Sequence, residues 1–331
     1  MALTLAEAKV GMADKVNQQV IDAFRRDSLL LDLLTFDDSV SPGTGGSTLV
    51  YGYQRLTTPS TVATRAINAE YTANEAKRTE YTTKVIPFGG SFNLDRVIIN
   101  TAGAIDELNF QLQQKIKAAV NYFHYVAING TSASSGAGYV VNTFDGLKKM
   151  VTGSATDIDG SGIQLTSSAE LASNSDAFLD SLDEFLTELN GADIMLMNSK
   201  MLSRVRSAAR RAGYYTRTED AFGRPVEYYN GIALMDAGKY YNGSAEVDCV
   251  ATSTPSSSAF GKTDIYAIKL GLDAFHGISV DGSKMVHTYL PDMNAPGAVK
   301  TGEVEMLAGV ALKNARCAGR LKDIAILPKT A

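Results

Sequence analysis

The feature that most constrains the fold of this chain is a polar run that lies between two strand-like patterns. Residues 57–84 are rich in Thr, Ala, Glu, Lys and Arg and hold almost no large aliphatic side chains. A stretch with so little apolar surface cannot bury a core of its own. The patterns on either side, at Leu49–Leu56 and at Val85–Leu94, are typical of strands. We therefore predict a long two-stranded arm that projects from the body of the protein.

Such an arm needs a surface to lie on, because an isolated hairpin is only marginally stable in water. We interpret this surface as a neighbouring copy of the chain, and the alternative is a mobile surface loop. Gly89-Gly90 falls inside the second strand pattern and predicts a bulge or a bend there.

A helical pattern precedes the arm and also carries apolar surface without a local partner. It covers Thr4–Phe36, with Thr4 and Glu7 placed as in a capping box. The sequence SVSPGTGGST at 39–48 interrupts any regular structure. We expect this helical segment to pack on another lobe or on another chain.

A long helix is predicted from Ala104 to Ile128, because apolar side chains recur there at helical spacing. Asn129-Gly130 should end this helix, since these residues can adopt a positive φ. His124 lies on the helix and is expected to be a packed or interface residue. The run TSASSGAG at 131–138 is typical of a linker and indicates a lobe boundary.

The lobe that follows combines helices and strands, so the chain is predicted to be α+β. A helix capped by Asn174 or Ser175 turns an acidic face outward, and a helix from Asn198 to Gly213 turns a basic face outward. These faces are either solvated separately or matched between adjacent copies in a ring. Strands are predicted at Ala192–Met197, Gly231–Asp236, Glu246–Thr252, Ile265–Leu270 and within Glu303–Ile326.

Composition narrows the classes of function. The chain has 31 basic and 36 acidic residues, a net charge of -5, and lacks the basic surplus of proteins that grip DNA phosphates. We expect no membrane span and no secretion signal. Cys249 and Cys317 lie far apart in the sequence and are predicted to be reduced packing residues of a cytoplasmic protein.

The usual signatures of catalysis are missing. His124, His276 and His287 form no metal-ligand pattern, and neither GxSxG nor HExxH occurs. Gly261-Lys262-Thr263 has the ending of a phosphate-binding loop, but position 256 is Ser where that loop needs Gly. We therefore predict that the chain is not an enzyme and has no cofactor or metal site.

Taken in order, these segments resemble the tailed-bacteriophage major capsid family with the Hong Kong 97-type fold. A helical N-terminal arm, an extended hairpin and a long helix ending at Asn129-Gly130 come first. An α/β lobe follows, with the strand–helix sequence ADIMLMNSKMLSRVRSAARRAG and the turn Gly223–Val226 ahead of Asn230–Leu234. The strand Glu303–Leu312 then leads to Ile324–Leu327.

The resemblance implies a division into domains. It places an N-terminal arm at 1–48, an E-loop hairpin at 49–92, a peripheral (P) domain at 93–138 and 285–331, and an axial (A) domain at 139–284. The implied function is a major capsid protein that assembles into hexamers and pentamers of an icosahedral phage head around double-stranded DNA. Assembly would occur in the host bacterial cytoplasm, and the protein would reside in the virion.

The resemblance also implies partners. They are other copies of the chain, a scaffolding protein, a portal, a decoration protein and DNA contacted non-specifically, with no membrane. Only about 40 residues precede the hairpin, so a separate scaffolding protein or prior cleavage is expected. Some family members cross-link an E-loop lysine to an asparagine, and Lys77 and Lys84 lie in this arm without the matching local context. The candidate residues for subunit interfaces are Phe24, Leu30, Arg65, Glu70, Glu75, Lys77, Arg78, Glu184, Arg204 and Arg210.

Three alternative functions remain, of which the first is the nearest rival and the other two belong to different classes. An encapsulin-type nanocompartment shares the fold but encloses protein cargo rather than DNA. An enzyme that uses a nucleotide would depend on Lys262, so Lys262→Ala would abolish binding of the nucleotide. A receptor-binding or adhesion module would form a discrete oligomer rather than a closed shell.

Overall fold

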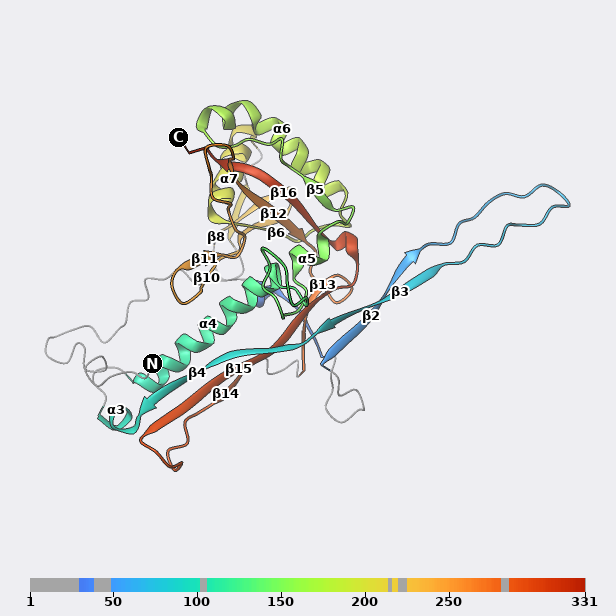
Figure 1. Ribbon diagram of the computed structural model, residues 1–331. Coiled ribbons are helices and arrows are strands. Elements are labelled where there is room, and N and C mark those ends of the chain that lie inside the picture. The colour runs from blue at the N-terminus through green and yellow to red at the C-terminus, as the bar shows by residue number, and fades with distance from the viewer. Residues whose placement is uncertain are drawn as a thin grey trace.

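The computed structural model describes residues 30–38, 49–101, 106–213, 216–219, 225–280 and 286–330. Most of the predicted N-terminal helix, with Thr4 and Phe24, lies outside these residues, as do Gly223 and Arg224 of the predicted turn at 223–226. Figure 1 shows a rounded lobe, a longer body beneath it that is built from a sheet and a helix, and an arm that extends away from both.

The rounded lobe is built on a seven-stranded sheet covered by two helices. Its strand order is β5-β16-β12-β6-β9-β8-β7. Side chains of the sheet and of the two helices together form one buried apolar cluster, in which Phe178, Phe185 and Met195 are fully buried. The strands are β5 Asp157–Asp159, β6 Ile194–Met197, β7 Thr216–Glu219, β8 Pro225–Tyr229, β9 Ile232–Asp236, β12 Gly261–Ile268 and β16 Ala318–Leu327, and the helices are α6 Ser168–Thr187 and α7 Ser199–Ala212.

Of the two helices of this lobe, α7 starts at its predicted capping residue and α6 starts before its predicted one. Asn198 caps α7 as predicted, since its side chain accepts a hydrogen bond from the Met201 amide at 2.7 Å. Helix α6 begins earlier than predicted, because Ser167 caps it and accepts from the Glu170 amide at 3.2 Å. Its first turns hold few apolar residues, so the sequence pattern showed only its later half.

The body beneath the lobe is a second sheet with one long helix on its inner face. Its longest strand, β15 (Val299–Leu312), pairs with β4 on one side and with β13 and β14 on the other. Helix α4 (Glu107–Asn129) covers the sheet, and Phe123 of the helix stacks on Phe88 of β4 with ring centroids 5.8 Å apart. The remaining elements here are β1 Phe36–Asp38, β4 Ile86–Asp95, α3 Arg96–Thr101, β13 Phe275–Ser279 and β14 Val286–Tyr289.

Gly130 follows α4 as predicted but for another reason. Its φ is -67°, so no left-handed conformation is involved. A Cβ at this position would lie 2.5 Å from the Phe144 carbonyl oxygen. Glycine therefore ends the helix where another segment of backbone comes too close for a side chain.

Of the bulge or bend predicted at Gly89-Gly90, the bulge is wrong. The ladder between β4 and β15 is continuous, from Asp95 opposite Val299 to Ile86 opposite Ala308. A Cβ on Gly89 would lie 1.9 Å from the Val304 carbonyl oxygen, so close backbone approach requires this glycine.

The partner strand of the predicted arm also differs from the prediction. Strand β2 (Val50–Thr58) pairs with β3 (Lys77–Lys84), which lies inside the polar run, whereas β4 belongs to the body. All of β3 except Thr83 is exposed, so it has no apolar face that would produce an alternating pattern.

The two closing strands lie in different sheets, although the predicted P domain contained both. Strand β15 is in the body, and β16 pairs with β12 in the lobe after the short helix η1 (Ala315–Cys317). Conversely, β13 falls in the range predicted for the A domain but pairs with β15. The chain therefore crosses between the two sheets more often than the predicted domain boundaries, at residues 138 and 284, allow.

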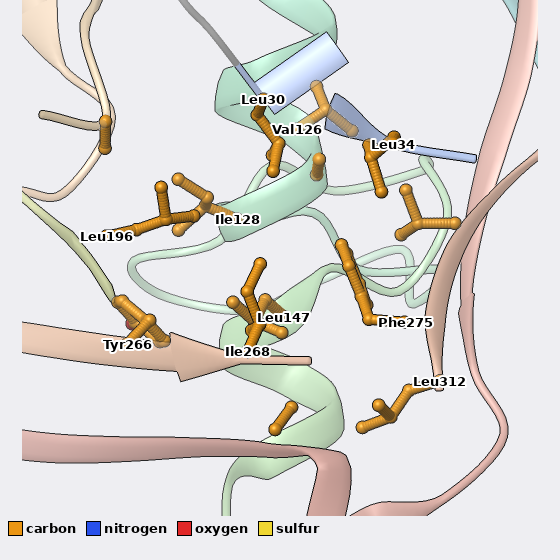
Figure 2. Close-up of a cluster of buried hydrophobic side chains, with 14 of the residues drawn as sticks. Leu30, Leu34, Val126, Ile128, Leu147, Leu196, Tyr266, Ile268, Phe275 and Leu312 are labelled. Atoms are coloured by element: carbon orange, nitrogen blue, oxygen red, sulfur yellow. The ribbon is translucent and has the colours of Figure 1, made fainter. Parts of the chain in front are cut away.

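A shared core joins the lobe to the body, and Figure 2 shows its centre. Tyr266 and Ile268 come from the lobe sheet, Phe275 and Leu312 from the body sheet, and all four are at most 2% exposed. The short elements α2 (Leu30–Leu33) and α5 (Leu147–Val151) also contribute to it, and β10 (Lys239–Tyr241) and β11 (Glu246–Asp248) form a small hairpin beside α4. None of the described helices is both long enough and apolar enough to cross a membrane.

Candidate assembly surface

The arm is an antiparallel ribbon attached to the body at its root. Its register runs from Val50 opposite Lys84 to Thr58 opposite Lys77. The Thr83 hydroxyl donates to the Val310 carbonyl of β15 at 3.1 Å. This buried contact fixes the point at which the ribbon leaves the sheet.

An aromatic and charged cluster, which we name the root latch, holds the inner face of the ribbon. It consists of Tyr51, Tyr53, Arg55, Tyr81, Asp37 and Lys313. The Tyr51 hydroxyl donates to the Asp37 carboxylate at 2.9 Å, and the Lys313 ammonium lies 3.7 Å from the same carboxylate. Burial raises the pKa of Tyr51 above its usual value, and burial also raises the pKa of Tyr53.

Arg55 is the central residue of the root latch. Its guanidinium lies 4.4 Å from the ring centroid of Tyr81 and donates through Nε to the Lys313 carbonyl at 3.1 Å. It also donates to the Leu312 carbonyl. Sequence reasoning missed this residue, although an arginine that alternates with tyrosines along one strand face was a usable signal.

Beyond the ribbon, residues 59–76 form the tip of the arm and are exposed throughout. Three large side chains stand in solvent: Val62 is 98% exposed, Ile67 91% and Tyr71 63%. The Thr61 amide donates to Asn74 Oδ1 at 3.0 Å and ties the two legs of the tip together. Exposed apolar side chains gathered on a projecting segment indicate a surface that a partner covers.

Arg65 gives the tip a defined cationic group. Its guanidinium lies 5.3 Å from the Tyr71 ring centroid and donates to the Ala69 carbonyl at 3.2 Å. No acidic side chain among the described residues forms an ion pair with it. Its charge is therefore available to another molecule.

The structure places the predicted interface residues in three regions. Arg65, Glu70, Glu75, Lys77 and Arg78 all lie exposed on the arm. Leu30 is 4% exposed and packs in the shared core of its own chain, and Phe24 lies outside the described residues. The other three candidates, Glu184, Arg204 and Arg210, lie on α6 and α7.

Helices α6 and α7 carry opposite charges. Glu184 of α6 and Arg210 of α7 are exposed, whereas Arg204 is partly buried and donates to the Thr166 carbonyl at 3.2 Å. Arg206 pairs with Glu227 of β8. Within the described part of the chain, no ion pair joins α6 to α7. The acidic residues of α6 are Glu170, Asp176, Asp180, Asp183 and Glu184, and the basic residues of α7 are Lys200, Arg204, Arg206, Arg210 and Arg211.

Gly261-Lys262-Thr263 does not form a phosphate-binding loop. The three residues lie in β12, the Lys262 ammonium is 3.9 Å from the Asp323 carboxylate, and Thr263 is buried. A phosphate loop needs backbone amides that converge between a strand and a helix. The interpretation of these residues as a nucleotide site is therefore wrong.

Comparison with known families identifies the chain. A family model described as SU10 major capsid protein matches residues 53–232, more than half of the sequence. The chain belongs to the SU10 major capsid protein family. The matched region contains most of the arm together with α4, α6 and α7. A search of curated proteins finds no match.

Solved structures show the same fold at low sequence identity. The holo-SrpI encapsulin complex from Synechococcus elongatus PCC 7942 matches with a TM-score of 0.63 and 15% identity, over 100% of this chain and 99% of that one. Mycobacterium phage Bobi gives 0.58 and 12%, over the whole of both chains. The capsid of Myoviridae phage XM1 gives 0.56 and 10%, over 94% of this chain and 97% of that one.

The predicted family and fold class are thereby confirmed. The chain is a tailed-phage major capsid protein with a Hong Kong 97-type α+β fold. Its copies assemble with one another into a capsid, and its place is the capsid of the virion.

Proposed function

We propose that copies of this SU10-family protein form hexamers and pentamers of an icosahedral head that encloses double-stranded DNA. The observation that carries this proposal is the arm, which leaves the body and exposes Val62, Ile67 and Tyr71 where no described residue of its own chain covers them. From Val50 to Ile67 an extended chain spans about 55 Å, enough to cross a neighbouring subunit.

Electron microscopy of the purified protein, co-expressed with its candidate partners, tests this proposal. Closed shells with hexamers and pentamers are the expected result. A variant with residues 60–75 replaced by a Gly/Ser linker should remain folded but form no shells. Monomers under every condition, or shells of unchanged yield in the linker variant, would contradict the proposal.

We further propose that the two sheets have the roles of the P and A domains. The body sheet with α4 would be peripheral, and the lobe with α6 and α7 would be axial and surround the five- and six-fold axes. The strands are assigned to these domains by their pairing, so β16 goes with the axial domain and β13 with the peripheral one.

Within the ring, we propose that the acidic face of α6 meets the basic face of α7 in the next copy. The supporting observation is that each helix carries charge of one sign and forms no ion pair with the other inside the chain. Opposite charges on facing surfaces would fix the orientation of neighbouring copies.

Charge reversal tests this ring contact. Glu184→Arg and Arg210→Glu should each reduce ring formation, and the two changes together should restore part of it. Sedimentation of the assembling protein measures the rings, and circular dichroism checks that each variant is folded. Reduction without any restoration in the double variant would contradict the pairing.

The remaining partners are proposed from the family. They are a scaffolding protein, a portal, a decoration protein and packaged DNA, with assembly in the host cytoplasm and no catalytic role for the chain. The net charge of -5 supports a surface that encloses DNA without holding it tightly.

One alternative has a specific observation in its favour. The encapsulin has a higher TM-score than the two phage structures compared with it above. A nanocompartment of this chain would contain a protein cargo. Nuclease-protected DNA inside particles from the native host supports the phage head, and a stoichiometric protein cargo without DNA supports the nanocompartment.

A further inference from the structure

The chain contains four Asn-Gly pairs, and the structure gives them different surroundings. They begin at Asn129, Asn190, Asn230 and Asn242. An asparagine before glycine can lose ammonia when the next amide nitrogen attacks its side chain, because glycine has no side chain to shield that nitrogen. Whether this attack occurs in the folded protein therefore depends on how each asparagine side chain is held.

Asn242 belongs to the hairpin that β10 and β11 form beside α4 (Figure 1). We define the hairpin tip as residues 241–245, all of which are exposed. The Asn242 Oδ1 accepts hydrogen bonds from the Ser244 and Ala245 amides, each at 2.9 Å. These bonds form an Asx turn, which folds the side chain back and holds its Cγ next to the Gly243 nitrogen.

The same two hydrogen bonds prepare the Asn242 side chain for attack. Backbone N–H groups that point at a carbonyl oxygen stabilise the negative charge that develops there when a nucleophile adds to the carbon. The Gly243 amide donates no hydrogen bond within the described part of the chain, so the nucleophile is available. The Tyr241 hydroxyl donates to the Gly243 carbonyl at 3.0 Å and holds this peptide in place.

Asn129 has the opposite surroundings. It is 8% exposed, and its Nδ2 donates to the Cys249 carbonyl at 2.7 Å. The Gly130 amide, which would be the nucleophile, donates to the Val126 carbonyl at 2.7 Å. Both reacting groups are occupied, so the fold should protect this pair.

Asn190 and Asn230 are exposed but are not held as Asn242 is. Among the described residues, neither side-chain oxygen accepts a hydrogen bond. Asn230 and Gly231 have φ values of 50° and 79° and form a tight left-handed turn between β8 and β9. Water reaches both pairs, but neither carbonyl has the two amide donors of Asn242.

We propose that Asn242 is a site of spontaneous deamidation that the folded hairpin tip accelerates. The Gly243 nitrogen forms a bond to Cγ and loses its proton, while the bond from Cγ to Nδ2 breaks and ammonia leaves. Water then opens the resulting succinimide ring. Opening at Cγ gives aspartate, and opening at the backbone carbonyl gives isoaspartate, with no oxidation or reduction in either case.

Either product adds a negative charge to the hairpin tip but leaves the base of the hairpin in place. Tyr240 stacks on Tyr125 of α4 with ring centroids 4.1 Å apart, and the Lys239 ammonium lies 3.2 Å from the Asp248 carboxylate. The hairpin therefore stays attached to α4 while the charge of its tip changes with the age of the protein.

Peptide mapping by mass spectrometry tests the proposal on the full-length protein. Samples are stored at neutral and mildly alkaline pH, folded and in urea, and deamidation is followed at all four pairs. In urea the four rates should be similar, because each pair then has only its local sequence. In the folded protein Asn242 should react about tenfold faster than in urea, whereas Asn129 should react more slowly.

Replacement of a donor provides an independent measurement. Ser244→Pro removes one of the two amide donors, since proline has no amide hydrogen. It should slow deamidation of Asn242 about tenfold in the folded protein and leave the rate in urea unchanged. Ala245→Ser keeps both backbone amides and is the matched control. Thermal melting checks that both variants are folded.

The comparison of folded and urea-treated wild-type protein is decisive even if Ser244→Pro does not fold. A rate at Asn242 that is no higher in the folded protein than in urea overturns the proposal. Equal rates in the wild-type protein and in a folded Ser244→Pro variant overturn it as well, because the amide donors then have no part in the reaction.

Discussion

Single buried residues in this protein tie distant segments together, and His124 is an example. It is fully buried on α4, and its Nε2 accepts a hydrogen bond from the Leu31 amide of α2 at 2.8 Å. Only a neutral ring can accept this bond. Burial lowers the pKa of His124 from 6.5 to about 3, so the ring stays neutral at all ordinary pH values.

This pKa makes stability depend on pH with a defined sign. Between pH 6.5 and pH 3 the unfolded chain binds a proton at His124 that the folded chain does not. The stabilisation is therefore complete above pH 6.5 and is lost as the pH falls, at about 1 kcal/mol for each pH unit. Urea denaturation from pH 7 to pH 5 should show this loss. His124→Gln, whose amide does not titrate, should have a shallower slope, and equal slopes would contradict the assignment.

At the scale of elements, close packing decides where glycine is required. The ladder between β4 and β15 holds two adjacent glycines with different surroundings. A Cβ on Gly89 meets the Val304 backbone, whereas a Cβ on Gly90 lies 3.3 Å from the flexible end of the Lys115 side chain. A lysine end can move at little cost, but a paired backbone carbonyl cannot.

We therefore predict opposite results from the same substitution at neighbouring positions. Gly89→Ala should lower the free energy of unfolding by about 2 kcal/mol or more, because the ladder must open to admit the methyl group. Gly90→Ala is the matched control and should change it by less than about 1 kcal/mol. Chemical denaturation of the unassembled protein measures both, and similar values would show that the close approach at Gly89 is not what requires glycine.

At the scale of the whole molecule, the shared core joins the lobe and the body into one cooperative unit. Phe275 of β13 lies in this core beside Tyr266, Ile268 and Leu312, and is fully buried. Side chains from both sheets lose contacts when either sheet opens. The two sheets should therefore unfold together rather than one after the other.

Calorimetry of the unassembled protein should show a single transition. Phe275→Ala should lower the free energy of unfolding by about 3–5 kcal/mol and shift the entire transition to lower temperature. Tyr289→Ala, at an exposed position of the same sheet, is the control and should have little effect. If Phe275→Ala splits the transition in two, the lobe and the body are separate folding units.

The sequence by itself determined the features that depend on local pattern. Helical spacing predicted α4 and α7, the Asn198 cap was read correctly, and the polar run predicted an arm without a core. The order of these elements was sufficient for the capsid fold, because each one leaves its pattern in contiguous residues.

Only the tertiary structure decided how the strands pair. It placed β3 beside β2, β4 beside β15, and β16 in the lobe, because hydrogen bonds between distant strands leave no periodic trace in either sequence. It also revealed the root latch around Arg55, where strand β2 meets the chain at Leu312 and Lys313. These segments lie far apart in the chain, so only the tertiary structure shows how the predicted arm is anchored.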